Sequence, residues 1–227
     1  MKQAISLSVI VTVLFATTFI LGGTSVLSQQ TARYSVTTTN LTRGQNLTAP
    51  AVIVHNQNFQ IFTLGAVAPE YLAPLAEDGG TAPLLTFAGN LRTQASPTVF
   101  EAKSAAGGGP GASSTFEVTA SGDFKLLSLA GMLATTNDGF YAIRSIQLPE
   151  QGSITVFVDA YDAGTERNSE SCQFVPGPPC GAHGQRDTNG AEGFVHIHAG
   201  IHGIGDIPAA IYDWRNPVAQ VTIRRLP

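Results

Sequence analysis

Apolar residues that recur at every second position constrain the fold of this chain more than any other feature. Tyr34, Val36 and Thr38 alternate with small polar residues. Because neighbouring side chains of a β-strand point to opposite faces, this alternation predicts a half-buried strand. By such alternation, or by short runs of β-branched and apolar residues, the sequence predicts about eight strands, at residues 34–38, 51–54, 59–63, 115–120, 124–133, 152–160, 193–201 and 218–225.

No long amphipathic helix accompanies these strands. Leu72, Leu75 and Ala76 share one helical face within residues 69–78, which predicts a short helical connector, interrupted by Pro74. A parallel sheet would need helices over both of its faces, and the sequence does not predict them. The predicted fold class is therefore all-β, an antiparallel two-sheet β-sandwich of about eight strands with one short helical connector.

The N-terminus has the layout of a secretory signal peptide. Lys2 precedes a nearly uncharged apolar run over residues 5–21, and small residues follow, so we expect residues 1–28 to be a leader cleaved near Ser28. An uncleaved anchor is the alternative, and no stable transmembrane span is expected once the leader is removed. Residues 29–227 then form a single domain, and the protein is expected to be secreted, periplasmic or at the cell surface.

Charge excludes one class of partner. The formal net charge is −4 and only 12% of the residues are charged. Binding to nucleic acid through bulk electrostatics needs a clustered Lys and Arg surface. The sequence offers no such cluster, so we expect no nucleic-acid partner.

The two cysteines, Cys172 and Cys180, flank a short segment rich in proline. In an exported chain an even number of closely spaced cysteines predicts a disulfide that closes a local loop. The alternative is a reduced pair that binds a metal, which would require two further soft ligands nearby.

Two polar turns follow predicted strands and carry carboxylates. Residues 135–140 contain Asp138 next to a glycine, and residues 161–166 place Asp162 and Glu166 four positions apart around another glycine. Each segment taken alone is typical of a turn. Hard oxygen ligands at such spacing are also what Ca²⁺ takes, because it binds about six to eight oxygens in flexible geometry.

Three histidines lie close together in the sequence, at His196, His198 and His202. On a strand His196 and His198 point to one face, and with His202 they could bind Zn²⁺ or Cu²⁺ and leave a position open for hydrolytic chemistry. The alternative is that these imidazoles form local hydrogen bonds along a strand and the glycine-containing turn at residues 203–206. The sequence contains no nucleophile elbow and no phosphate-binding glycine loop, so we expect no enzyme.

Several segments together resemble the spondin N-terminal domain family in its compact bacterial form. The most specific of them is Tyr-Asp-Ala-Gly-Thr-Glu at residues 161–166, which is similar to an Asp-Ala-Gly-Thr-Asp segment of the animal domains. The other segments are residues 34–45, 75–79, 127–140 and 194–206. The resemblance implies a C2-like, Greek-key sandwich that binds calcium and takes part in extracellular adhesion.

The resemblance also implies a ligand set. Asp138 falls where the family has an acidic residue after a strand, although Asn-Asp-Gly-Phe stands here in place of the usual Pro-Asp-Trp. Asp162 and Glu166 fall on the two acidic positions of the Asp-Ala-Gly-Thr-acid segment, with Glu in place of the final Asp. The histidine segment and the cysteine loop have no counterpart in the animal domains.

The expected function is that of a secreted calcium-binding module without catalysis. Its partner would be an extracellular protein, a glycan or another cell-surface ligand, bound by loops that the metal orders. The alternative is a zinc- or copper-dependent enzyme built on His196, His198 and His202.

Overall fold

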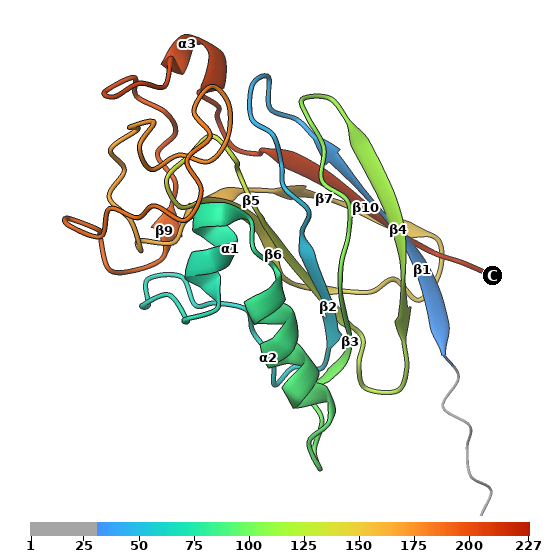
Figure 1. Ribbon diagram of the computed structural model, residues 1–227. Helices are drawn as coiled ribbons and strands as arrows, with labels where there is room; N and C mark the ends of the chain where they lie inside the picture. The colour runs from blue at the N-terminus through green and yellow to red at the C-terminus, as the bar shows by residue number, and fades with distance from the viewer. Residues whose placement is uncertain (1–30) are drawn as a thin grey trace, which may run out of the picture.

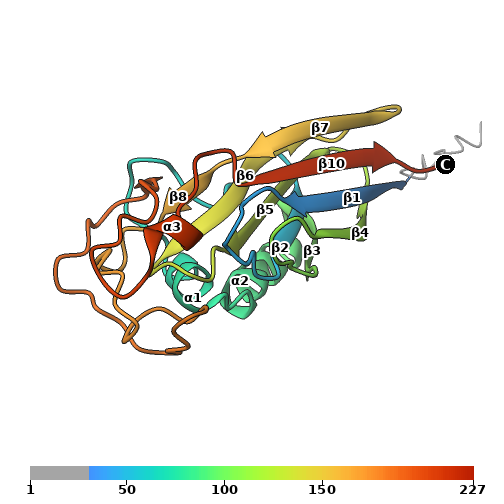
Figure 2. The ribbon, with the colours of Figure 1, turned by 90° about the horizontal axis from the view of Figure 1, so that it is seen from above.

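The computed structural model describes residues 31–227 and contains two antiparallel β-sheets packed face to face (Figure 1). Viewed from above, helices lie against the outer face of one sheet and form a third layer (Figure 2). The predicted antiparallel two-sheet sandwich is therefore confirmed. Within residues 31–227 the sheets comprise ten strands rather than about eight. The predicted signal peptide, residues 1–28, lies outside the described residues.

The smaller sheet contains the strands in which period-two alternation is clearest. Its order is β4 (Ser113–Ala120), β1 (Ala32–Asn40), β10 (Ala219–Arg225) and β7 (Ser153–Val158). In β1 the side chains of Tyr34, Val36 and Thr38 are buried, whereas those between them are partly exposed. One face of this sheet is therefore in the core and the other faces solvent, as alternation requires.

The larger sheet is buried on both faces near its centre. Its order is β3 (Val99–Ser104), β2 (Ala51–His55), β5 (Leu126–Met132), β6 (Gly139–Gln147), β8 (Ala160–Asp162) and β9 (His196–Ile197). In β2, Val52 and Val54 pack between the sheets, whereas Ala51 and Ile53 pack on the helical side. A strand covered on both faces is apolar throughout, and this is why β2 has no alternation in its sequence.

The helices differ from the prediction of a single connector interrupted by proline. The three helices within residues 31–227 are α1 (Leu72–Asp78), α2 (Ala82–Arg92) and the short α3 (Ala209–Tyr212). Pro74 lies in the first turn of α1, where a backbone N–H has no helical acceptor, so the helix is not broken there. Leu72 and Leu75 of α1 and Leu84 of α2 are fully buried against the larger sheet. The two longer helices are thus a covering layer.

Two predicted strands are wrong in whole or in part. Residues 59–63 form no strand, because Ile61 and Phe62 are adjacent and both buried under the helices, which a strand with one exposed face cannot achieve. Of residues 193–201 only His196–Ile197 are in a strand. Gly193 and Gly200 have positive φ angles of 81° and 97°, so the backbone turns on both sides of β9.

The chain crosses from one sheet to the other between β7 and β8. The sequence predicts one strand over residues 152–160, whereas β7 pairs with β10 in the smaller sheet and β8 pairs with β6 in the larger one. This crossing places Asp162, the last residue of β8, directly opposite Gly139 at the start of β6. The two predicted acidic turns are therefore neighbours in space.

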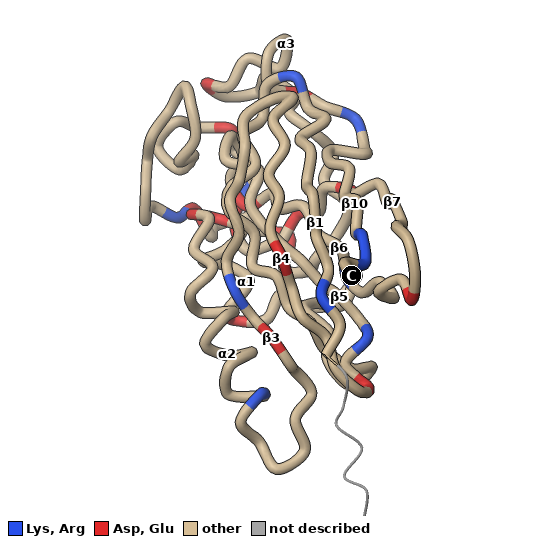
Figure 3. Tube along the Cα trace, turned by 90° about the vertical axis from the view of Figure 1, so that its right-hand side faces the viewer, with Lys and Arg blue, Asp and Glu red and all other residues tan. Residues whose placement is uncertain are grey.

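Cys172 and Cys180 form the predicted disulfide. Basic residues are distributed over helices, strands and loops (Figure 3). Among residues 31–227, no helix has the length and apolar character required to cross a bilayer.

Candidate metal centre

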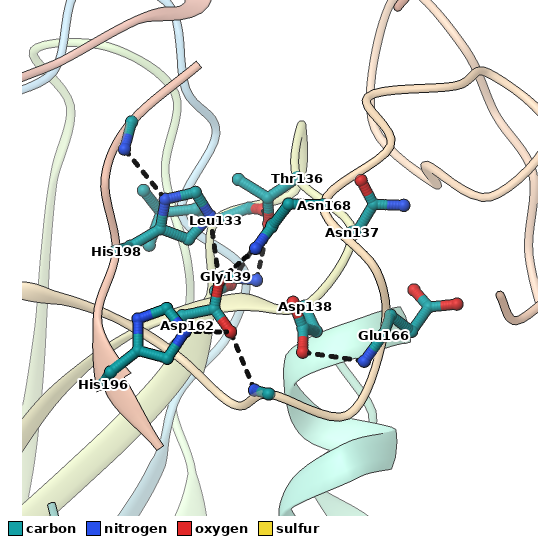
Figure 4. Close-up of polar contacts among 12 residues, drawn as sticks. Leu133, Thr136, Asn137, Asp138, Gly139, Asp162, Glu166, Asn168, His196 and His198 are labelled. Carbon is teal, nitrogen blue, oxygen red and sulfur yellow. Dashed lines mark hydrogen bonds and ion pairs between the residues drawn. The ribbon is translucent and has the colours of Figure 1, made fainter. Parts of the chain in front are cut away.

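The two acidic turns and the histidine segment meet at one end of the sandwich. Asp138 immediately precedes β6, Asp162 ends β8, and His196 begins β9. In the strand register Asp162 is opposite Gly139 on one side and opposite His196 on the other. Residues far apart in the sequence are thus placed together by the hydrogen-bonded ladder of the larger sheet (Figure 4).

One carboxylate oxygen of Asp138 accepts hydrogen bonds, and the other has no hydrogen-bond partner. Its Oδ2 accepts hydrogen bonds from the backbone N–H groups of Thr165, at 2.7 Å, and Glu166, at 3.0 Å. Its Oδ1 is buried and has no hydrogen-bond partner in the structure. An unpaired buried carboxylate oxygen is costly unless a proton or a cation reaches it.

Asp162 is fully buried and is the centre of the polar cluster. Its Oδ1 accepts a hydrogen bond from the backbone N–H of Gly164, at 2.7 Å, and its Oδ2 accepts one from Nδ2 of Asn168, at 2.6 Å. Gly164 has a φ of 65°, and a Cβ there would lie 2.3 Å from the carbonyl oxygen of Phe194. The turn that wraps Asp162 therefore requires glycine at this position.

Glu166 is buried but does not converge with the other two carboxylates. Its Oε1 accepts a hydrogen bond from the backbone N–H of Asp187, at 2.7 Å, and its Oε2 is buried without a partner. In Figure 4 the carboxylate of Glu166 points away from Asp162. The structure brings Asp138 and Asp162 together, as the sequence predicts, and places the carboxylate of Glu166 on the far side of Asp138.

Burial raises the pKa of each of these carboxyl groups. For Asp138 the largest cause is desolvation, followed by repulsion from the nearby charge of Asp162; desolvation also raises the pKa of Asp162. For Glu166 desolvation raises the pKa to about 8. Carboxylates in such surroundings favour a neutralising partner. The unpaired oxygens of Asp138 and Glu166 are hard ligands, and they fit Ca²⁺, which prefers oxygen.

The three histidines do not form one cluster. His196 and His198 face Asp162, with Nε2 atoms 3.5 Å and 4.0 Å from its carboxylate oxygens. His202 is exposed, and its Nδ1 lies 3.8 Å from Glu170. Burial, followed by the charges of the other two histidines, lowers the pKa of His198 to about 3. The structure thus separates His202 from the pair that faces Asp162.

Sequence reasoning missed two acidic residues of this region. Glu192, in the loop before β9, has a carboxylate oxygen that lies within 4.8 Å of ligand atoms of both Asp162 and His196. Within residues 31–227 this is the one such group of three or more His, Cys, Asp or Glu residues. Glu170 is buried, with a positive φ of 55°, and its carboxylate accepts hydrogen bonds from the backbone N–H groups of His202 and Ile204. Neither residue belongs to a recognisable local motif.

The antiparallel sandwich and its disulfide define the class of extracellular β-sandwich modules. Within that class, the sequence model of the Spondin_N family matches residues 43–174, more than half of the chain. The chain therefore belongs to the spondin N-terminal domain family, a family of non-enzymatic modules. The matched range includes Asp138, Asp162 and Glu166, whereas the histidine segment lies beyond it. Among curated proteins, no match to this sequence is found.

Proposed function

We propose that this protein is a secreted or cell-surface binding module whose loop end is organised by Ca²⁺. The observation that carries the proposal is Asp138, whose buried Oδ1 has no hydrogen-bond partner, beside the buried carboxylate of Asp162. Glu166, whose carboxylate lies on the far side of Asp138 (Figure 4), has a further unpaired buried oxygen, Oε2. Oxygen ligands from flexible loops suit Ca²⁺, and membership of the spondin N-terminal family supports the same ion.

The residues of the chain would act by holding the loops in one arrangement around the ion. Asp138 accepts hydrogen bonds from the backbone of Thr165 and Glu166, so a cation on Asp138 would also fix the turn at residues 161–166. When bound, the ion supplies positive charge that offsets the repulsion among the buried carboxylates. The ordered loops then present a surface to a partner.

The partner is proposed to be an extracellular protein, a glycan or another ligand at a cell surface. Large apolar side chains are exposed on the segments around the acidic cluster, including Phe194 at 44%, Ile197 at 48% and Ile204 at 71% exposure. Exposed apolar side chains next to a rigid polar cluster are common where proteins bind one another. This surface supports binding and adhesion rather than catalysis.

The test is the binding of Ca²⁺ by titration calorimetry, together with the melting temperature in calcium and in chelator. Wild-type protein is expected to bind Ca²⁺ and to melt at a higher temperature when it is bound. Asp138→Asn and Asp162→Asn are expected to lose both effects. Asp123→Asn is the matched control, because Asp123 is exposed and lies in the turn between β4 and β5, away from the cluster. A wild-type protein whose melting temperature ignores millimolar calcium would contradict the proposal.

A further inference from the structure

His196 presents its Nε2 to a carboxylate oxygen of Asp162 at 3.5 Å, which is longer than a hydrogen bond. Its Nδ1 lies 3.0 Å from the carbonyl oxygen of Ile197. A carbonyl oxygen can only accept, so Nδ1 is the nitrogen that carries the proton. In the neutral imidazole Nε2 therefore has a free lone pair, and this atom is buried without a hydrogen-bond partner, 3.5 Å from Oδ1 of Asp162.

That contact is unfavourable without a cation. Two electron-rich atoms, Nε2 of His196 and Oδ1 of Asp162, face each other in a place from which water is excluded. A doubly protonated His196 would remove the repulsion, but the 3.5 Å separation is longer than an N–H···O hydrogen bond. A metal ion between the two atoms would satisfy both. Ligating histidines commonly donate their other N–H to a backbone carbonyl, as His196 does to Ile197.

Glu192 completes a set of three ligands. One oxygen of Glu192, one oxygen of Asp162 and one nitrogen of His196 all lie within 4.8 Å of one another. The backbone N–H of Gly193 donates to the carbonyl oxygen of Gly164, at 2.9 Å, and so holds the loop of Glu192 against the turn that follows Asp162. Glu192 is exposed, so an ion can enter from solvent.

His198 supplies an independent sign that a ligand belongs here. Its Nδ1 accepts a hydrogen bond from the backbone N–H of Gly200, at 3.0 Å, so its Nε2 carries the proton. This Nε2 is buried without a partner, 4.0 Å from Oδ2 of Asp162, on a side chain that is 3% exposed. In this tautomer His198 is a donor rather than a metal ligand. It is placed to donate to Asp162, or to water on an ion held by Asp162.

We propose that Asp162, Glu192 and His196 form a second cation site, specific for a divalent transition ion of borderline softness such as Zn²⁺. One imidazole nitrogen with two carboxylates suits Zn²⁺, whereas Ca²⁺ takes oxygen ligands. Three protein ligands leave a further coordination position for water. The site shares only Asp162 with the proposed calcium site, so Glu192 and His196 test it separately.

The test is zinc content after equilibrium dialysis against Zn²⁺ in excess Ca²⁺, on protein produced without a polyhistidine tag. Wild-type protein is expected to retain about one zinc ion per chain. His196→Gln and Glu192→Gln are expected to lose this zinc, and His198→Asn to weaken its binding by about 10-fold to 100-fold. His202→Gln is the matched control, because its imidazole is exposed beside Glu170, and it is expected to retain the ion.

Two results would overturn the proposal: wild-type protein that holds no zinc, or His196→Gln and Glu192→Gln variants that hold as much as the control. Glu192 is exposed, so its substitution tests the site without removing a buried side chain. Co²⁺ in place of Zn²⁺ provides a second readout, since its visible absorption should change in His196→Gln. Asp138→Asn separates the two sites: it is expected to abolish the effect of Ca²⁺ and to leave zinc bound.

Discussion

Apolar side chains between the two sheets and acidic side chains at the loop end of the sandwich are both fully buried. Val36, Leu129 and Val221, in the core between the sheets, have no exposed surface, and neither do Asp138 and Asp162. In the first region burial itself supplies the stabilisation, because removing apolar surface from water needs no particular partner. In the second region burial is unfavourable unless each oxygen finds a donor, a proton or a cation.

This difference teaches which part of the molecule responds to its surroundings. The apolar core has the same energetics at any neutral pH and any metal concentration. The loop end has one oxygen of Asp138 bonded to backbone N–H groups and the other unpaired. Its free energy therefore depends on what the solution supplies, and each experiment below measures whether the two regions respond separately.

The largest expected effect is in the core. Leu129→Ala removes a fully buried side chain from the cluster between the sheets, and a Leu-to-Ala change of this kind lowers the free energy of unfolding by about 2–5 kcal/mol. The loss, measured by urea denaturation, is expected to be equal with calcium and with chelator. A loss that differs between the two conditions would show that core and loop end are not independent.

Calcium is expected to stabilise the loop end by a slightly smaller amount that depends on pH. At a concentration about 100-fold above the dissociation constant, Ca²⁺ adds about 2.7 kcal/mol. The pKa of Glu166 is raised to about 8 and that of Asp138 is also raised, so the folded metal-free protein holds protons that the unfolded chain releases. Its stability therefore falls as pH rises from about 4.5 to about 8.

Because Ca²⁺ replaces those protons, its stabilising effect should be smallest near pH 5 and largest near pH 8. Thermal denaturation across this range, with calcium and with chelator, measures both curves. A metal-free protein whose stability rises with pH over the same interval would contradict the raised pKa values. Asp123→Asn should follow the wild-type curves.

Removing the disulfide is expected to have a comparable effect of different origin. Cys172 and Cys180 are separated by 8 positions, and the chain-entropy model gives about 2.5 kcal/mol for a ring of this size. The double variant Cys172→Ala/Cys180→Ala should lose this amount of stability in urea denaturation. Its response to Ca²⁺ should persist, since the disulfide constrains the unfolded chain and supplies no ligand. Loss of the calcium response would show that the ring also positions the acidic turns.

The last comparison is between two arginine–glutamate pairs, one with a buried carboxylate and one exposed. Arg186 donates to Glu77, whose side chain is 5% exposed, with Nη2 and Oε1 2.6 Å apart. Arg186→Met leaves that carboxylate buried without its partner and should cost about 1–3 kcal/mol. Arg33→Met breaks a pair with Glu117 in which both side chains are more than half exposed, and it should cost about 0.2–1 kcal/mol. Equal costs in urea denaturation would remove the distinction.

The sequence predicts strands most clearly where one face of the strand is buried and the other is exposed to solvent. In β1 and β10 the alternation is plain, and both strands are found where it places them. Alternation gives no signal where both faces are covered, although apolar and β-branched runs still predict β2 and β5 correctly. In β6 the residues from Gly139 to Ile143 are buried throughout because the helices lie over the outer face, so no period of two exists to be read. For the covering layer the sequence predicts only one short connector within residues 69–78, whereas the structure has both α1 and α2 in that layer.

The candidate site is predictable only as far as its local motifs reach. Asp138 follows β5 and Asp162 ends β8. Both strands run antiparallel to β6, which lies between them, so their C-terminal ends lie at the same end of the sheet. The direction of the Glu166 carboxylate depends on a hydrogen bond that it accepts from the backbone N–H of Asp187, across the loop. Glu192 approaches the site only through tertiary contacts. Those contacts are set by loop packing, which no spacing along the chain encodes.

Asp162 lies between two neighbourhoods, with Asp138 on one side and the imidazoles of His196 and His198 on the other. A cation bound on one side of Asp162 weakens the electrostatic attraction between this carboxylate and a cation on the other side. Binding of a cation on one side must therefore change the free energy of binding on the other side, and the reverse effect has the same size. The residue is in this sense a thermodynamic coupler.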